Sequence, residues 1–200
     1  RNIKELFLMK ISILLPYKEN FSPKYAGAVS LFVNDTTKQS TYKKNTYIYG
    51  NMIYDNALSK NYINLNLDKK FYQSSSKQYV QSFIEYEKKI NSNIIEVHNR
   101  PNYIKLIKKN FKNKLILYFH NDPLTMNGSK STKDRLFLLN NIDKIIFNSN
   151  WSKNRFFVNF PNKSFLSQKT SVCYQSAPKT KINFSKKEKI ISFIGKLNSA

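Results

Sequence analysis

The two histidines of the chain are the side chains best suited to chemistry near neutral pH. Each follows a short apolar run, Ile94–Val97 for the first and Leu115–Phe119 for the second, and each is followed by asparagine and, three positions on, by proline. An imidazole placed in this way can hydrogen-bond substrate hydroxyls or transfer protons. One such histidine would be interpreted as a cap for backbone groups, but two at equivalent positions favour a functional pair. The residues concerned are His98, Asn99, His120 and Asn121.

A glycine near the N-terminus is a second candidate for ligand binding. Gly27 lies where a loop is predicted to turn into a helix, with Ala28 next to it. A glycine there lets backbone N–H groups approach a phosphate closely, with the positive end of the helix behind them. The alternative is a turn glycine without a ligand. The glycine-rich dinucleotide fingerprint is missing, which argues against a dehydrogenase or an epimerase.

Other polar residues also follow apolar runs. Arg100 comes two positions after the first histidine, and Ser149 follows the run Ile145–Phe147. Ser149 can bind a substrate oxygen or cap the next helix, and capping is the favoured interpretation. The nearest carboxylates, Glu19 and Asp122, have no second carboxylate beside them in sequence. A hydrolase that uses two carboxylates therefore has no support.

The elements that must position these residues are short apolar runs that alternate with amphipathic stretches. Runs that are apolar almost throughout are typical of parallel strands buried on both faces. The stretches between them predict helices, with N-terminal signals at Ser74, Pro101, Thr132 and Ser149. We therefore predict an α/β fold with a Rossmann-like, doubly wound, mostly parallel sheet, in which ligands bind beyond the carboxyl ends of the strands. The predicted strands are Ile11–Leu15, Tyr47–Tyr49, Ile94–Val97, Leu115–Phe119, Ile145–Phe147, Ser171–Tyr174 and Ile190–Ile194.

The composition limits the class of protein. The net charge of +22 can indicate contact with nucleic acid, anionic lipid or phosphorylated substrates. It can also reflect a lysine- and asparagine-rich composition of the kind that AT-rich coding produces, and this interpretation is favoured because the lysines are scattered. A single cysteine, Cys173, excludes an internal disulfide, and no Cys/His cluster suits zinc, so a reducing compartment fits best.

Five segments of the chain, taken in order, resemble glycosyltransferase family 4. They are Leu15–Ala28, Glu96–Pro101, Tyr118–Pro123, Ile145–Ser152 and Ile190–Leu197. The resemblance implies the N-terminal half of a GT-B glycosyltransferase, in which two Rossmann-like domains face each other across a cleft. It implies an acceptor-binding domain over residues 9–184, starting at Met9, and the first strand of a donor-binding domain over residues 185–200.

The resemblance also implies roles for individual residues. His120 matches the catalytic histidine that contacts the transferred sugar, and His98 would line the acceptor side. Gly27 matches the glycine of the loop that meets the donor phosphates. Lys196 stands where the family commonly has an arginine that grips the diphosphate. We place the remaining acceptor- or donor-binding contacts at Ala28, Asn99, Arg100, Asn121 and Ser149.

The activity implied by the resemblance is transfer of a sugar from a UDP- or GDP-sugar to a glycan or lipid-linked acceptor. Transfer would be retaining, need no metal or other cofactor, and serve cell-envelope polysaccharide or lipopolysaccharide synthesis. We expect a cytoplasmic enzyme whose basic surface contacts the anionic inner face of the membrane. The alternative is a basic α/β nucleic-acid-binding module. It explains the charge but not the two histidines, so no nucleic-acid partner is expected.

Overall fold

The computed structural model describes residues 9–67, 74–160 and 166–176. Within them, the strands form one seven-stranded sheet in the order β3-β2-β1-β4-β5-β6-β7, and every adjacent pair is parallel. This confirms the predicted Rossmann-like α/β fold class. The strands are β1 (Ile11–Leu14), β2 (Thr46–Gly50), β3 (Tyr62–Asn64), β4 (Ile94–His98), β5 (Lys114–Phe119), β6 (Lys144–Phe147) and β7 (Thr170–Val172).

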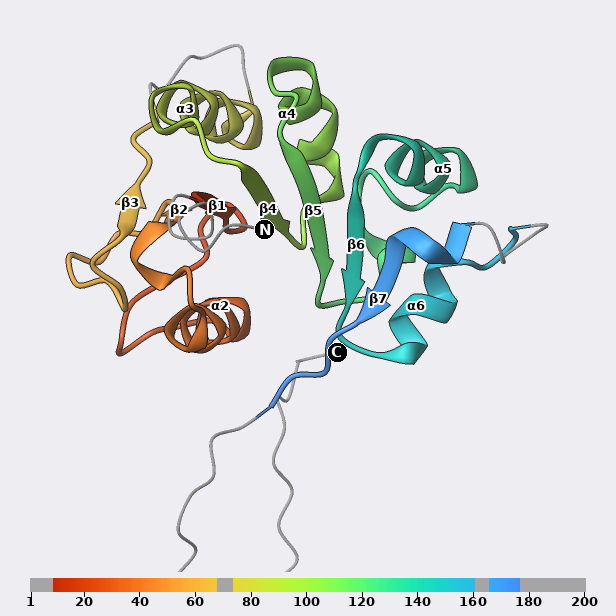
Figure 1. Ribbon diagram of the computed structural model, residues 1–200, viewed down its shortest axis with the longest axis horizontal. Coiled ribbons are helices and arrows are strands. Elements are labelled where there is room, and N and C mark those ends of the chain that lie inside the picture. Colours follow the sequence, from red (N-terminus) through yellow and green to blue (C-terminus); the bar gives the residue numbers. More distant parts are fainter. Residues whose placement is uncertain (1–8, 68–73, 161–165, 177–200) are drawn as a thin grey trace, which may run out of the picture.

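Helices cover both faces of the sheet, but unequally (Figure 1). Three helices, α3, α4 and α5, lie above the sheet in this view, whereas α2 lies below it under β1 and β2. Helix α6 packs beside β6 and β7, where Phe156 contacts Phe119 and Phe147. The helices are α2 (Ala28–Gln39), α3 (Ser75–Ile90), α4 (Ile104–Asn110), α5 (Thr132–Asn141) and α6 (Asn150–Phe156), with 3₁₀ turns η1 (Lys43–Asn45), η2 (Pro101–Tyr103), η3 (Pro123–Thr125) and η4 (Leu166–Lys169).

Side chains alternate between the two faces of each strand, which divides the core in two. The larger cluster lies under α3, α4 and α5 and includes Val97, Leu117 and Phe119, all fully buried. The smaller cluster lies under α2 and includes Ile48 and Leu15. The polar side chains of β4 and β5 therefore lie on the opposite face of the sheet from the larger cluster, where fewer helices cover these strands.

Most predicted elements match observed ones, with three exceptions. Strand β3 was not predicted, because its three residues lie among polar neighbours. Ser131 rather than Thr132 caps α5, and its hydroxyl accepts a hydrogen bond from the backbone N–H of Asp134. The predicted strand Ile190–Ile194 and the proposed domain boundary at residue 185 lie outside the described residues. No described helix is long and apolar enough to cross a membrane.

A buried carboxylate ties α3 to the centre of the sheet. Glu87 is fully buried. It accepts hydrogen bonds from the Ser12 hydroxyl at 2.5 Å, from the Ser92 N–H at 2.8 Å and from the Ser92 hydroxyl. The Tyr49 hydroxyl lies 3.5 Å away. One side chain thus joins β1, β2 and the turn that leads into β4.

We expect Glu87→Ala to lower the free energy of unfolding by about 3 kcal/mol, because it leaves several buried donors without an acceptor. Urea unfolding followed by circular dichroism measures the effect. The matched control is Glu85→Ala, two residues away on the exposed side of the same helix, which should change stability by less than about 0.5 kcal/mol. Equal effects of the two substitutions would contradict the structural role of Glu87.

Candidate functional site

The two histidines lie side by side, as the strand-end pattern predicted. Strands β4 and β5 are neighbours, and His98 stands opposite Tyr118 in their register. His120 lies two residues beyond Tyr118, directly after β5, and its Nε2 lies 2.8 Å from His98 Nδ1. Their rings are 5.1 Å apart and inclined by 22°. The parallel pairing of two strands therefore builds a hydrogen-bonded imidazole pair at the carboxyl edge of the sheet.

His98 is the inner member of this pair, and it is fully buried. Its ring stacks on Tyr118 at 4.9 Å, and its Nε2 lies 2.7 Å from Glu96 Oε1. His98 therefore presents no exposed surface, and its side-chain contact towards the exposed edge is His120. The expectation that His98 lines the acceptor side stays a prediction.

His120 is the outer member and is only partly buried. Its Nδ1 lies 3.3 Å from Nε2 of the exposed Gln175, and the Phe32 ring from α2 meets it edge-on at 5.1 Å. Burial, followed by the neighbouring His98, lowers the pKa of His120 from 6.5 to about 3. At neutral pH this imidazole is therefore uncharged and serves as a hydrogen-bonding group rather than as a cation.

Asn99 and Asn121 link the carboxyl ends of β4 and β5 by hydrogen bonds. Asn99 is buried and has a left-handed backbone with φ of 56°, which asparagine tolerates better than most residues. Its Oδ1 accepts a hydrogen bond from the backbone N–H of His120 at 3.2 Å, and its Nδ2 donates to Asn121 Oδ1 at 3.3 Å. Arg100 donates to the Asn99 carbonyl at 2.8 Å. In this structure these predicted binding residues hold the backbone beside the histidines, while Asn121 remains exposed.

Gly27 immediately precedes α2, as predicted, but an anion of the protein itself lies at this helix end. The Glu19 carboxylate accepts a hydrogen bond from the Ser30 N–H at 3.3 Å. A Cβ on residue 27 would overlap that carboxylate and would push the flexible Glu19 side chain aside, while the φ of −74° is ordinary. A phosphate next to Gly27 and Ala28 would have to displace Glu19.

Two predicted site residues remain: Ser149, which caps a helix, and Lys196, which lies outside the described residues. Ser149 caps α6, and its hydroxyl accepts a hydrogen bond from the Ser152 N–H at 3.1 Å. The favoured interpretation of Ser149 is thus confirmed. Lys196 lies outside the described residues. Asp122 forms an ion pair with Arg155 at 2.9 Å beside the second strand end.

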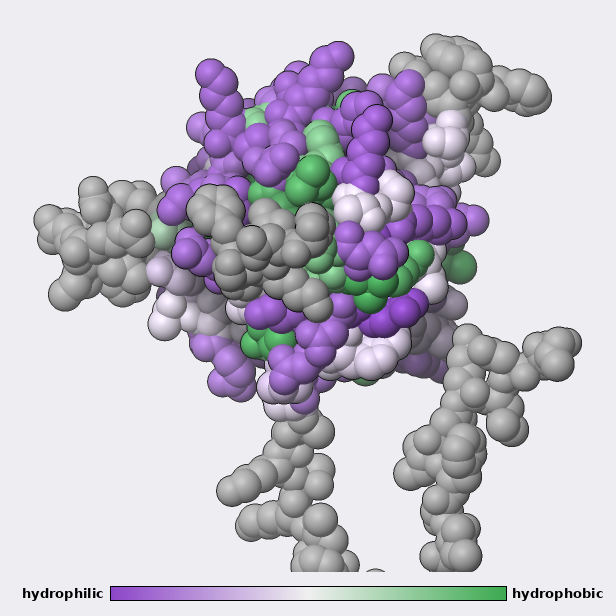
Figure 2. All heavy atoms as spheres, turned by 90° about the vertical axis from the view of Figure 1, so that its right-hand side faces the viewer, coloured by the Kyte–Doolittle hydropathy of each residue, from purple (hydrophilic) through white to green (hydrophobic). Residues whose placement is uncertain are grey.

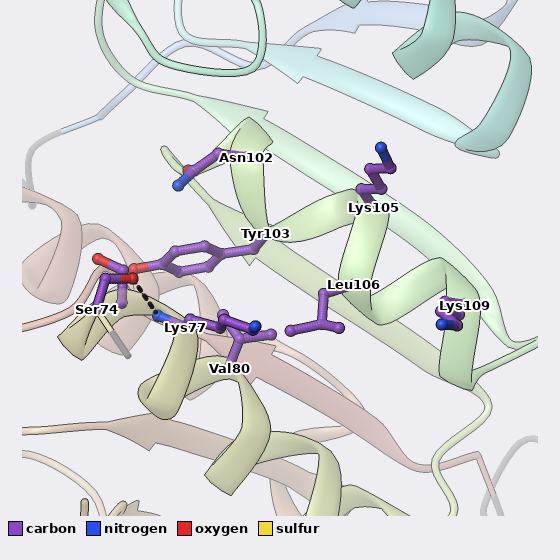
Figure 3. A pocket seen from close by; sticks show the side chains of 9 residues that line it. Ser74, Lys77, Val80, Asn102, Tyr103, Lys105, Leu106 and Lys109 are labelled. Atoms are coloured by element: carbon purple, nitrogen blue, oxygen red, sulfur yellow. Dashed lines mark hydrogen bonds between the residues drawn. The ribbon is translucent and has the colours of Figure 1, made fainter. Parts of the chain in front are cut away.

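A groove of about 350 Å³ lies between the first turns of α3 and helix α4 (Figure 3). Val80 and Leu106 form its apolar part, and Tyr103 closes one end, where its hydroxyl accepts a hydrogen bond from the Tyr17 N–H at 3.3 Å. No lining residue from the described part of the chain is acidic, whereas three are lysines. The full lining is Ser74, Ser76, Lys77, Val80, Asn102, Tyr103, Lys105, Leu106 and Lys109.

Hydrophilic residues also cover other parts of the surface. Figure 2 shows hydrophilic side chains over much of the face formed by the β7 end of the sheet, with smaller apolar areas between them.

Within the described residues, no group of three or more His, Cys, Asp or Glu side chains is arranged to hold a metal ion.

Neither a protein-family model nor a curated protein matches the sequence, but solved structures with a similar fold exist. HepE of Anabaena, solved in complex with UDP, is 15% identical, with a TM-score of 0.54 over 83% of this chain and 44% of that chain. Sucrose-phosphate synthase from Thermosynechococcus elongatus is 12% identical, with a TM-score of 0.53 over 82% of this chain and 48% of that chain. The described sheet and its helices therefore have the Rossmann-like α/β fold of part of each of these proteins. The chain spans less than half the length of either protein.

Sequence reasoning missed three members of the site: Glu96, Phe32 and Gln175. A signal for Glu96 existed, because a residue two positions before His98 on a strand shares its face. The other two come from α2 and from the segment after β7, and only the folded chain brings them to His120.

We expect stability to fall between about pH 7.5 and pH 5 because His120 gains a proton more easily when unfolded. Its folded pKa of about 3 lies below the ordinary 6.5, so the contribution is fully present at pH 7.5 and is lost progressively as the pH falls from there towards 3. By about pH 5 the loss should reach about 2 kcal/mol. Urea unfolding at both pH values measures it, and the His120→Gln variant should lack this component. Equal losses in both proteins would show that His120 is not the origin.

Proposed function

We propose that this chain belongs to a glycosyltransferase similar to family 4, in which it forms the acceptor-side domain. The reaction would move a sugar from a UDP- or GDP-sugar to a glycan or lipid-linked acceptor, with retention and without a metal, in cell-envelope polysaccharide or lipopolysaccharide synthesis. The observation that carries the proposal is a neutral, partly exposed imidazole at the carboxyl edge of a GT-B-type sheet. In open α/β sheets this edge is where ligands bind.

The site residues suit the chemistry of sugar transfer. A neutral imidazole can accept a hydrogen bond from a sugar hydroxyl and so orient the ring for reaction. Negative charge develops on the leaving diphosphate, where helix N-termini and lysine side chains stabilise it. In the proposed complex, Glu19 leaves the N-terminus of α2 as the diphosphate approaches Gly27. Lys196 would supply a cation from the donor side.

The first test is His120→Ala in the full-length protein, assayed with UDP- and GDP-sugars. We expect turnover to fall by at least about tenfold, since positioned acid–base or hydrogen-bonding groups contribute that much or more. The urea midpoint at neutral pH should stay close to that of the parent, and Glu85→Gln serves as the unaffected control. Parent-like turnover of His120→Ala would remove the proposed catalytic role.

We further propose that the groove between α3 and α4 receives an anionic, partly apolar group, such as the phosphate end of a lipid-linked acceptor or a lipid headgroup. Support comes from three lysines, Lys77, Lys105 and Lys109, which line the groove together with the apolar Val80 and Leu106. The groove also adjoins the loop after β1 through Tyr103. A cytoplasmic enzyme could in this way take its acceptor from the inner face of the membrane.

The second test is flotation with vesicles of phosphatidylcholine alone or mixed with phosphatidylglycerol. Changing both Lys105 and Lys109 to Glu should reduce the bound fraction at least about tenfold, since each lysine near an anionic surface contributes about 1 kcal/mol. The matched control changes Lys43 and Lys44, which are exposed on η1, to Glu and carries the same net charge. Equal losses in both variants would indicate attraction by net charge alone. Tight, salt-sensitive binding to duplex DNA instead would favour the nucleic-acid alternative.

A further inference from the structure

We propose that Glu96 is a positioning residue that acts through His98 to fix the tautomer of His120, leaving Nδ1 of His120 as a bare hydrogen-bond acceptor. The proposal rests on the function proposed above, because it assigns that acceptor to a ligand hydroxyl. It adds a residue that does not touch the ligand but decides what His120 can do there.

The observation is a row of four side chains joined end to end. Glu96 Oε1 lies 2.7 Å from His98 Nε2, and His98 Nδ1 lies 2.8 Å from His120 Nε2. At the outer end, His120 Nδ1 lies 3.3 Å from Gln175 Nε2. The row begins at a carboxylate on the helix-poor face of the sheet and ends at the exposed carboxyl edge.

The protons of this row can be assigned from its inner end. An ionised carboxylate only accepts hydrogen bonds, so His98 must carry a proton on Nε2. A neutral His98 then has a lone pair on Nδ1, and His120 must donate to it from its own Nε2. His120 is left with a lone pair on Nδ1.

The outer end of the row agrees with this assignment. Gln175 presents its amide nitrogen to His120 Nδ1, and an amide nitrogen only donates. His120 Nδ1 must therefore accept. If His98 were an imidazolium instead, it would donate from both nitrogens, His120 would carry its proton on Nδ1, and two donors would face each other at Gln175.

The surroundings hold the row in place. His98 is fully buried and lies against Tyr118 and Phe32, which hold its ring in the plane that points Nε2 at Glu96. The Glu96 side chain is 19% exposed and reaches His120 only through His98. The side chains that contact this pair are the Glu96 carboxylate, the Tyr118 and Phe32 rings and, at the outer end, the Gln175 amide. The carboxylate is the group that fixes the proton at the inner end of the row.

The consequence concerns the ligand. A sugar hydroxyl that takes the place of the Gln175 amide can donate to Nδ1 as the amide does. Without Glu96, His98 can carry its proton on Nδ1 as well as on Nε2. When the proton is on His98 Nδ1, it is donated to His120 Nε2, and His120 then carries its own proton on Nδ1. Protein molecules in which His120 carries its proton on Nδ1 would present a hydrogen-bond donor where the sugar hydroxyl needs an acceptor. The same wrong tautomer arises when the orienting carboxylate of a catalytic triad is lost.

The test is long-range proton–nitrogen NMR on the chain labelled with ¹⁵N-histidine at neutral pH. Because the sequence has two histidines, the spectrum contains few ring nitrogens, and His120→Gln assigns them. We expect His120 Nδ1 at the shift of an unprotonated nitrogen and Nε2 at that of a protonated one. In Glu96→Leu the Nδ1 signal should move towards the protonated range, whereas Glu85→Gln should leave it unchanged.

Two results would overturn the proposal: a protonated Nδ1 in the parent chain, or an unchanged Nδ1 signal in folded Glu96→Leu. If Glu96→Leu fails to fold, Glu96→Met, which is unbranched and offers no strong hydrogen-bond acceptor, replaces it under the same criteria. The measurement uses no sugar, so it stands or falls apart from glycosyl transfer. In the full-length enzyme, Glu96→Leu should lower kcat more than it changes KM, since the hydroxyl-binding geometry remains while its acceptor is lost.

Discussion

The parallel pairing of β4 with β5 is the constraint on which the candidate site depends. It places His98 opposite Tyr118 and brings His120 to 2.8 Å from His98. A shift of one residue in this register would turn one imidazole to the opposite face of the sheet and separate the pair. The register is held by the large core on one face and, at the edge, by the Asn99 side chain, which accepts from the backbone of His120. Packing on one side of the sheet thus fixes chemistry on the other.

Much of this framework could be predicted from the sequence, because strands buried on both faces are apolar along their whole length. The central strands β1, β4, β5 and β6 carry that signal, and the parallel fold follows from their alternation with helices. Strand β3 carries no such signal, since it lies at the edge of the sheet and needs little burial. Its place comes from pairing with β2, a contact that no local pattern encodes. The one-residue error at the α5 cap arose because Ser131 and Thr132 are both suitable caps, and only geometry chooses between them.

The site was predicted less completely than the fold, for a related reason. Both histidines could be predicted as site residues, because each directly follows an apolar run and the end of such a run marks the end of a buried strand. Burial of His98 under Phe32 could not be predicted, since it depends on where α2 crosses the sheet. For the same reason the sequence suggested Gly27 as a phosphate contact without showing that Glu19 already lies against it. Tertiary contacts decided each of these points.

The placement of the acidic residues bears on the meaning of the net charge. The sequence has 12 acidic residues against 34 basic ones. Several of the acids have defined structural partners: Glu19 at the start of α2, Glu87 inside the core, Glu96 beside His98, and Asp122 with Arg155. Acidic residues are thus retained where hydrogen bonding requires an anion, while lysines occupy much of the exposed surface. This pattern is expected when composition drifts towards lysine and only structurally required acids resist the drift. It makes the local set of lysines around an apolar groove, rather than the total of +22, the feature that distinguishes a specific anion contact from general basicity.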